Sequence, residues 1–304
     1  MNSDEKLDQI LLDLELIKNH LKIMPDKFVT VTDIEGKIEN YEVYALNELK
    51  ISQSTTNNQK SAIRGFLNFS NGIINKETVK EYLESNDSTS WKSNQLKALR
   101  KFTRDYLKLG NWINEFVFSK EKAKIKESIP SNDELALFCS KLDYPVQMIF
   151  LILVTSGLRV GEILQLQIEH LDFDTNMIDV SEVHNGNNKS SWISFMTQQV
   201  GGFIENYVED LTENTLFSIS YETVQKNFQK VSEETGIKIN PHLLRTVFTE
   251  KCTKSGLEEK YIDAFCGRIP QSVIRKHYTD YSPEAMRIHY DKIEANLILP
   301  FDDS

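Results

Sequence analysis

The sequence predicts a mainly α-helical protein with a small β-hairpin or sheet, divided into two domains. This prediction rests on three observations. Apolar residues recur at steps of three and four from about residue 52 to 118 and again from residue 132 onward. A charge-rich segment separates these stretches, and one pair of short runs alternates as strands do. A chain of 304 residues is long enough for two domains with separate cores.

Residues 1–25 are predicted to form an amphipathic helix, and residues 26–50 a hairpin or an extended linker. The apolar seam of the helix consists of Leu7, Ile10, Leu14, Ile17, Leu21 and Met24. This seam either pairs with another subunit or folds onto its own domain, because fewer than about three heptads is marginal for an independent coiled coil. Residues 28–45 alternate around Gly36, which is typical of a hairpin.

Residues 51–118 are predicted to form three or four amphipathic helices that hold DNA phosphates. The stretch from Lys92 to Lys108 contains six cations and one acid, Asp105. The candidate DNA-binding cations share one face on each of two helices and are Lys60, Arg64, Lys97, Arg100, Lys101, Arg104 and Lys108. The alternative is a solvated charged face, which is normally the commoner outcome. The near absence of interleaved acids favours the DNA clamp.

The net charge of −10 is awkward for a protein that binds DNA, because phosphate binding depends on lysine and arginine. The acids are concentrated, however, in the first 15 residues, from Asp33 to Glu42, from Glu205 to Asp210 and at the C-terminal end. Such segregation leaves room for one cationic, DNA-facing surface.

Several classes of protein are disfavoured by what the sequence lacks. No apolar run reaches the roughly 18 residues of a membrane helix, and the first residues do not resemble a signal peptide. We therefore expect a cytosolic protein without a membrane partner. The cysteines, Cys139, Cys252 and Cys266, lack the spacing of a zinc site and are expected to be buried thiols. No phosphate-binding loop or metal-ligand cluster is recognisable, so no cofactor is expected.

After a linker at residues 119–130, the second domain (131–304) contains two candidate anion-binding segments. Arg159 lies between two predicted helices, and its planar guanidinium can present two parallel donors to two phosphate oxygens. His242 and Arg245 lie on one face of a first helical turn after Pro241, beside a helix N-terminus that itself attracts anions. The alternatives are a surface bridge from Arg159 to Glu162, and a packed histidine with a solvent-exposed arginine.

Taken together, the motifs of the second domain resemble the catalytic domain of tyrosine recombinases, which include phage-type integrases and Xer-like recombinases. The matching segments, in order, are Thr155-Ser-Gly-Leu-Arg-Val-Gly-Glu162, His242-Leu-Leu-Arg245, Ser255-Gly256, Cys266-Gly-Arg268 and His277-Tyr278. The segment from 52 to 118 is similar to the core-binding domain of that family. The spelling Gly-Arg-x-Pro-x-Ser-Val followed by His-Tyr is similar to integrases of archaeal viruses and integrated archaeal elements.

The resemblance implies a two-domain recombinase that cuts and rejoins double-stranded DNA through a 3′-phosphotyrosyl intermediate, without metal or ATP. The implied catalytic residues are Tyr278, Arg159, Arg245, His242, Lys189 and Arg268. Tyr278 would attack phosphorus, the arginines would hold the non-bridging oxygens, His242 would relay a proton, and Lys189 would protonate the leaving oxygen. The family also implies a tetramer on DNA, integrating or excising a mobile element in the host cytoplasm or nucleoid.

Some alternatives remain open on the sequence. Arg268 replaces the histidine that is commoner in the family, and Lys189 is assigned because it is the only lysine on the predicted hairpin. Tyr281 and Tyr290 are rivals to Tyr278, which is favoured by its spacing of ten residues from Arg268. An Xer-like chromosome-dimer resolvase of the same chemistry and a catalytically decayed DNA-binding or architectural protein are the alternative functions.

Overall fold

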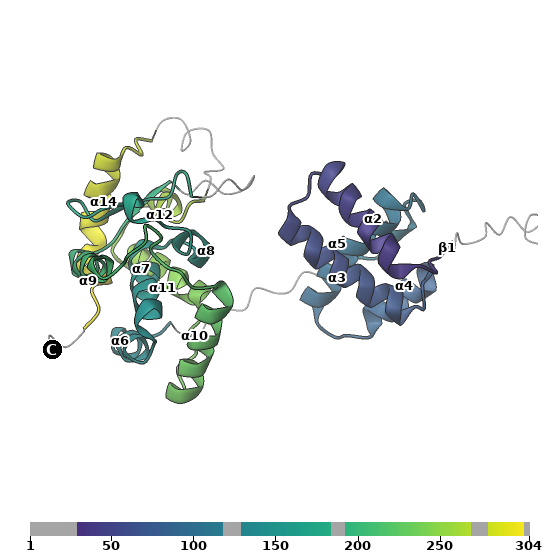
Figure 1. Cartoon of the computed structure of the whole chain (residues 1–304), viewed down its shortest axis with the longest axis horizontal. Helices are drawn as coiled ribbons and strands as arrows, with labels where there is room; N and C mark the ends of the chain where they lie inside the picture. Colours follow the sequence, from purple (N-terminus) through teal and green to yellow (C-terminus); the bar gives the residue numbers. More distant parts are fainter. Residues whose placement is uncertain (1–28, 118–128, 184–191, 269–278, 301–304) are drawn as a thin grey trace, which may run out of the picture. The chain divides into compact units, whose positions relative to one another are not determined.

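The structure, a computed structural model, divides into two compact units, residues 1–125 and 126–304 (Figure 1). It describes residues 29–117, 129–183, 192–268 and 279–300. Four sequence predictions lie outside the described residues: the coiled-coil seam, most of the linker, Lys189 and Tyr278.

In its described part, the first unit is a bundle of helices with one two-stranded antiparallel sheet. Its α-helices are α2 (Ile34–Asn47), α3 (Gln53–Phe69), α4 (Lys76–Glu84) and α5 (Thr89–Arg100). A π-helix, η1 (Lys101–Tyr106), continues α5, and a 3₁₀-helix, η2 (Trp112–Glu115), follows. The strands β1 (Val29–Thr30) and β2 (Ile73–Ile74) pair with each other. The core of the unit forms where α2, α3, α5 and η1 meet, around Tyr41, Phe66 and Phe102.

The hairpin expected over residues 28–45 is wrong, because most of this segment is the helix α2. The Asp33 side chain accepts a hydrogen bond from the Gly36 amide at 2.9 Å and so caps the helix. Ile38, Tyr41 and Ala45 are buried together, at the three- and four-residue steps of a helix face. The alternation in the sequence includes Val43, which is exposed on the helix and not part of the buried face, and Val29–Thr30 are extended as expected.

The basic helix expected from residue 92 to 108 is also not a single α-helix. It changes to a π-helix after Arg100, and the Leu107 amide donates to the Phe102 carbonyl, five residues earlier, at 2.9 Å. Each residue of such a turn is displaced around the axis relative to an α-helix. Arg104 and Lys108 therefore do not continue the helix face that carries Lys97 and Arg100, whereas the Lys101 amide still donates to the Lys97 carbonyl as in an α-helix.

The second unit surrounds a buried helix, α7, with further helices and one three-stranded sheet. Its helices are α6 (Asn132–Ser140), α7 (Tyr144–Ser156), α8 (Val160–Ile163), η3 (Ile168–His170), α9 (Gln198–Glu209), α10 (Tyr221–Thr235), α11 (Pro241–Lys254), α12 (Glu259–Phe265) and α14 (Pro283–Leu297). The antiparallel sheet has the order β3 (Leu171–Asp172), β4 (Met177–Asp179) and β5 (Ile193–Phe195). The expected hairpin is confirmed as β4 and β5, whereas β3 is not anticipated by the sequence.

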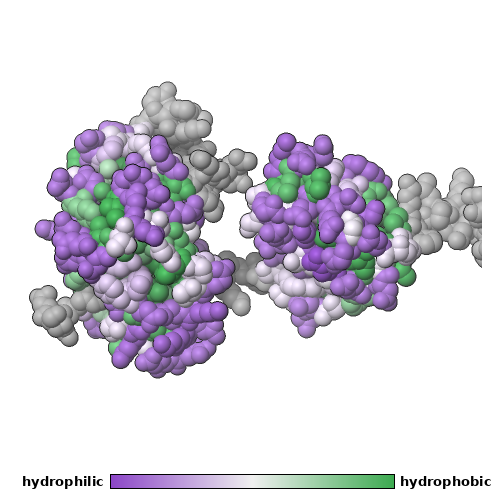
Figure 2. All heavy atoms as spheres, viewed as in Figure 1, coloured by the Kyte–Doolittle hydropathy of each residue, from purple (hydrophilic) through white to green (hydrophobic). Residues whose placement is uncertain are grey.

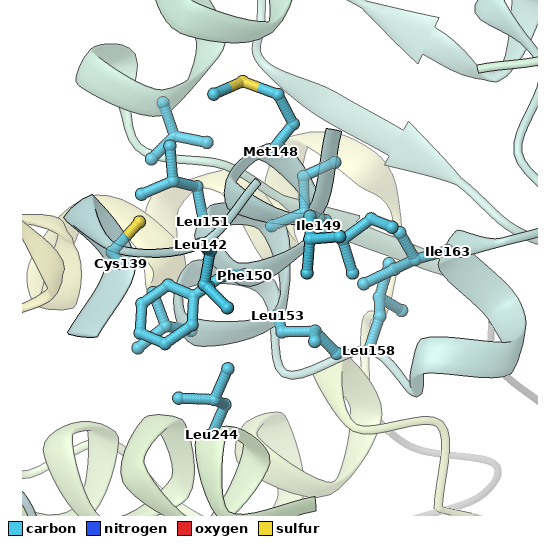
Figure 3. Packing of buried hydrophobic residues seen from close by; sticks show 14 of the residues in the cluster. Cys139, Leu142, Met148, Ile149, Phe150, Leu151, Leu153, Leu158, Ile163 and Leu244 are labelled. Atoms are coloured by element: carbon cyan, nitrogen blue, oxygen red, sulfur yellow. The ribbon is translucent and has the colours of Figure 1, made fainter. Parts of the chain in front are cut away.

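The core of the second unit is built on α7, in which every residue from Met148 to Ser156 is buried. Figure 3 shows side chains of α7 packed together with Leu158, Ile163 and Leu244. Burial on all sides explains why this stretch is a continuous apolar run and not an amphipathic pattern. The helix ends at Gly157, whose φ of 68° is left-handed, and this ending places Arg159 at the edge of the core.

A second apolar cluster fixes α14 on the same unit. Met286, Tyr290, Ile293 and Leu297 of α14 are buried, and Tyr290 packs against Phe195 of β5. The surface seen in Figure 2 is mostly hydrophilic, with scattered hydrophobic patches on each unit. Within the described ranges, no helix combines the length and the apolar character needed to cross a bilayer. All three cysteines are buried and unbridged, as expected.

Candidate functional site

Arg245 joins the three segments that carry the candidate catalytic arginines. Its Nη1 donates to the Gly157 carbonyl at 2.8 Å, and its Nη2 donates to the Cys266 carbonyl. These acceptors lie two residues before Arg159 and Arg268, respectively. Arg245 itself is only 6% exposed, on the first turns of α11. The segments that carry Arg159, Arg245 and Arg268 are therefore joined by one buried guanidinium.

Local sequence signals place Arg245 where it can make these contacts. The Asn240 side chain caps α11 by accepting from the Leu243 amide at 2.9 Å, and Pro241 occupies the first helical position. Leu244 and Val247 bury the opposite flank of α11 in the core. The α11 backbone is thus fixed on both sides of Arg245.

Arg159 is held by a buried carboxylate. Its Nη1 donates to Oε1 of Glu162 at 2.8 Å, and its backbone amide donates to Oε2 of the same side chain at 2.7 Å. Glu162 is 1% exposed, so this pair is not the surface bridge considered in the sequence analysis. A carboxylate in this position both closes the first turn of α8 and fixes the direction of the guanidinium.

Arg268 follows α12 and pairs with an acid of that helix. Its Nη1 lies 2.9 Å from Oδ1 of Asp263, and its backbone amide donates to the Asp263 carbonyl at 2.8 Å. Gly267 has a left-handed φ of 56°, which turns the chain out of α12. Arg268 remains exposed and is directed from the end of α12 rather than buried in it.

The electrostatics of Arg245 reflect the other two guanidinium groups of the site. Burial lowers the pKa of Arg245, and the positive charges of Arg159 and Arg268 lower this pKa further. Glu162 partly offsets this effect on Arg245, and Asp263 forms an ion pair with Arg268. The site therefore carries closely spaced positive charges that an anion would stabilise.

The remaining candidates of this site are not all described. His242 is exposed on the first turn of α11, three residues before Arg245. Thr246, which follows Arg245, has its hydroxyl near the His242 carbonyl, at 3.5 Å. Tyr278 and Lys189 lie outside the described residues, so their assignments remain predictions.

The two rival tyrosines have structural partners. The Tyr290 side chain is fully buried, and its hydroxyl donates to the Thr155 carbonyl at 2.9 Å. Burial raises the pKa of Tyr290 well above its usual value, so this phenol is a poor source of phenolate. Tyr281 is partly buried, with its ring 6.3 Å from that of Tyr261.

In the first unit, four of the seven candidate DNA-binding cations form ion pairs with acids of the same unit. Lys60 pairs with Glu42, and Arg64 pairs with Glu35. Lys101 and Arg104 both pair with Asp105, and the first cause that holds the pKa of Asp105 down, to about 2, is its bond to Arg104. The structure thus pairs Lys60 and Arg64 with acids that lie far from them in the sequence, and Lys101 and Arg104 with the one acid of their own stretch.

The other three candidate cations have different surroundings. Arg100 donates to the Phe116 carbonyl at 2.7 Å, while its Nε is buried without a hydrogen-bond partner. The Lys108 ammonium lies 5.8 Å from the centre of the Tyr44 ring. Lys97 is exposed. Of this group, Lys97 and Lys108 are the cations most accessible to a ligand.

The acceptors that orient the site were only partly predicted from the sequence. The pair of Arg159 and Glu162 was considered only as a surface bridge, whereas Glu162 is buried. Asp263 has no such signal, because it lies five residues before Arg268, and Arg268 follows the end of α12. The carbonyls of Gly157 and Cys266 have no sequence signal, because a backbone acceptor is present at every position. Within the described ranges, no group of three potential metal ligands lies together.

The sequence model of the phage integrase family matches residues 128–284, which is slightly more than half of the chain. Among curated proteins, a tyrosine recombinase XerA of Saccharolobus solfataricus is 25% identical over 246 residues, covering 73% of this chain and 81% of that protein. A tyrosine recombinase of Pseudothermotoga lettingae is 24% identical over 260 residues, covering 77% and 90%.

Solved structures share the fold. A lambda integrase dimer bound to a COC′ core site has a TM-score of 0.64 at 16% identity, covering 92% of this chain and 88% of the integrase. The Tn1549 transposon integrase in complex with circular intermediate DNA has a TM-score of 0.62 at 15% identity, covering 84% and 94%. These matches agree with the helical second unit and its small sheet, and with the family match over residues 128–284 this chain belongs to the phage integrase family of tyrosine recombinases.

Proposed function

We propose that this protein is a site-specific DNA recombinase that works through a 3′-phosphotyrosyl intermediate, without metal or nucleotide. Family membership implies a DNA strand transferase. The finer chemistry is supported by one observation above all, the cluster of Arg159, Arg245 and Arg268 around a pair of backbone carbonyls. Guanidinium groups in such a cluster suit a phosphodiester whose transition state carries extra negative charge.

In this proposal the described arginines bind the scissile phosphate and the remaining residues move protons. Arg159 and Arg245 donate to the non-bridging oxygens, and Arg268 supplies a third donor but cannot act as a base. Tyr278 attacks phosphorus, and the departing 5′-oxygen takes a proton from Lys189, while His242 accepts or relays the tyrosine proton. The phosphotyrosyl bond conserves the energy of the phosphodiester, so rejoining needs no cofactor.

The proposed partners are double-stranded DNA and further copies of this chain. Related structures include a lambda integrase dimer bound to a core site and a lambda integrase tetramer bound to a Holliday junction. A tetramer on two duplexes would allow strand exchange at this site too. Its proposed place of action is where host DNA lies, the cytoplasm or nucleoid, and its proposed role is the integration or excision of a mobile element.

The experiment is a covalent-trapping assay on nicked suicide duplexes, selected for binding from a random pool. We expect a protein–DNA adduct that resists denaturation, is lost in Tyr278→Phe and is kept in the matched variant Tyr281→Phe. Arg245→Gln should lose the adduct as well. Binding without an adduct on every selected duplex would refute the enzyme and favour a decayed DNA-binding protein on this scaffold.

The relatives named XerA favour a second candidate, the resolution of chromosome dimers by the same chemistry. The two functions differ in their substrates. A resolvase recombines two identical sites on one molecule, whereas an integrase joins two different sites on separate molecules. Supplying purified protein with both pairs of substrates, built around the selected site, distinguishes them.

A further inference from the structure

The acids of α2 lie against the cations of α3. Glu35, Glu39 and Glu42 follow one another at steps of four and three, so they share one face of α2. Two of them pair with α3: Glu35 with Arg64 and Glu42 with Lys60. The acidic stretch and the two cations lie apart in the sequence, and the structure brings them together.

The contacts are specific rather than diffuse. Arg64 is bidentate, with Nε 2.8 Å from Oε1 and Nη2 2.7 Å from Oε2 of Glu35. Glu42 accepts from Lys60 through Oε2 and from Gln53 through Oε1, the latter at 2.7 Å. Each carboxylate therefore uses both of its oxygens. The bond to its cation is the first cause that lowers the pKa of Glu35 and that of Glu42.

Packing holds the two helices in this register. Ile38, Tyr41 and Ala45 of α2 are buried in the same cluster as Ile63 and Phe66 of α3. The Tyr41 hydroxyl also donates to Oε1 of Gln59 at 2.7 Å. The buried face of α2 thus fixes this helix, and the carboxylates it carries, to α3. No loop has to be ordered to keep the carboxylates beside Lys60 and Arg64, so this entropic cost is absent.

We propose that α2 is an electrostatic cover that withholds Lys60 and Arg64 from DNA phosphates. The inference rests on the proposed DNA-binding function. A phosphate approaching these cations meets carboxylates that already neutralise their charge, and Glu39 adds a further negative charge on the same face. Non-specific affinity for DNA comes almost entirely from phosphates neutralised by free cations, so the cover limits that affinity.

The test measures the affinity for a 30-base-pair duplex of random sequence between about 50 and 200 mM salt, with the full chain. The variant Glu35→Gln/Glu42→Gln removes the cover and keeps the size of both side chains. If two cations are released to phosphates, the salt slope steepens by about 1.8, so the affinity falls roughly tenfold more across this salt range than it does for wild type.

A matched control separates local release from a change of total charge. Glu77 and Glu81 are exposed residues of α4. Glu77→Gln/Glu81→Gln changes the net charge by the same amount and should leave the slope near that of wild type. Restoring the wild-type slope by adding Lys60→Gln/Arg64→Gln to the first variant would attribute the gain to the two cations. Equal slopes for the cover variant and the control would overturn the proposal.

A second variant keeps the test decisive if removal of the acids unfolds the first unit. Lys60→Gln/Arg64→Gln alone should change the slope by less than about 0.5, because covered cations make no phosphate contacts in wild type. A loss of about 1.8 would show that DNA uses these cations despite α2, and the proposal would be wrong. If wild type forms the covalent adduct but the salt slopes of the variants do not change as expected, only the cover is refuted. If neither wild type nor any variant binds DNA, the proposed function fails together with the cover.

Discussion

Replacing Gly157 with alanine should disturb both the stability of the second unit and the candidate site. Gly157 ends α7 in a left-handed conformation, with φ of 68°, and its carbonyl accepts from Nη1 of Arg245. A Cβ at this position would lie 2.4 Å from one ring carbon of Phe248 and 2.6 Å from the next. Phe248 is fully buried, so its ring has little room to withdraw.

The size of the effect can be worked out from two contributions. Placing alanine in the left-handed region costs about 1–2 kcal/mol. Forcing a methyl group against a packed core ring costs a further ~1–3 kcal/mol. Gly157→Ala should therefore lower the free energy of unfolding by about 2–5 kcal/mol, which is a large part of the 5–15 kcal/mol typical of a domain. The carbonyl of residue 157 accepts a hydrogen bond from Arg245, so a shift of this backbone should also displace Arg245. Covalent cleavage should therefore fall by roughly 10- to 100-fold.

The matched control is Gly236→Ala. Gly236 also ends a helix of this unit, α10, with a left-handed φ of 74°, but a Cβ there would meet nothing within 4 Å. It should cost only the conformational contribution, about 1–2 kcal/mol, and leave cleavage intact. Urea unfolding followed by circular dichroism measures the free energy of unfolding of both variants. The unfolding transition that shifts in Gly236→Ala belongs to the second unit.

Equal losses in the free energy of unfolding for Gly157→Ala and Gly236→Ala, within about 0.5 kcal/mol, would refute the clash with Phe248. This margin is the usual limit of additivity. A double-mutant cycle with Phe248→Leu provides an independent check. Leucine removes part of the ring, so Gly157→Ala should cost at least ~1 kcal/mol less in that background if the clash is real. An unchanged cost would assign the loss to the backbone alone.

Three further outcomes follow from the described residues. Tyr290→Phe should cost about 1 kcal/mol by removing the bond to Thr155, yet keep the covalent adduct, and loss of the adduct at normal stability would reinstate Tyr290 as nucleophile. Burial lowers the pKa of Lys251 from 10.5 to about 8. The charged form of this side chain therefore destabilises the folded protein, and this penalty is complete below about pH 8. Lys251→Met should consequently stabilise the protein at pH 7, with an advantage that shrinks between pH 8 and 10.5 in unfolding titrations. A chelator should leave adduct formation unchanged within twofold, and a larger loss reversed by a divalent metal would contradict the cofactor-free mechanism.

The sequence predicted best what is encoded locally. Gly157, Asn240 and Pro241 signal helix ends, and these ends position Arg159 and Arg245. The helix α2 was mistaken for a hairpin because Tyr41, Glu42 and Val43 alternate as strand residues do, although Val43 is exposed on the helix. Its acids could not be assigned to Lys60 and Arg64, since a pair 18 or 29 residues apart depends on how two helices pack. The π-helix Lys101–Tyr106 could not be predicted either, because the extra residue of one wider turn does not visibly change a hydrophobic pattern with a period of 3.6 residues.

The charges of the candidate site indicate why it should bind a phosphate more strongly than its exposed residues suggest. Arg159 and Arg268 each have a carboxylate, in Glu162 and Asp263. Arg245 has two backbone carbonyls and, within the described residues, no ion pair with an acid. Its charge is therefore the least compensated of the three, although it is the most buried, and burial together with its two neighbours lowers its pKa. An incoming phosphodiester would supply the missing negative charge, so the free energy stored in this repulsion is released when DNA binds, and most fully in the transition state, where the phosphate carries the greatest charge.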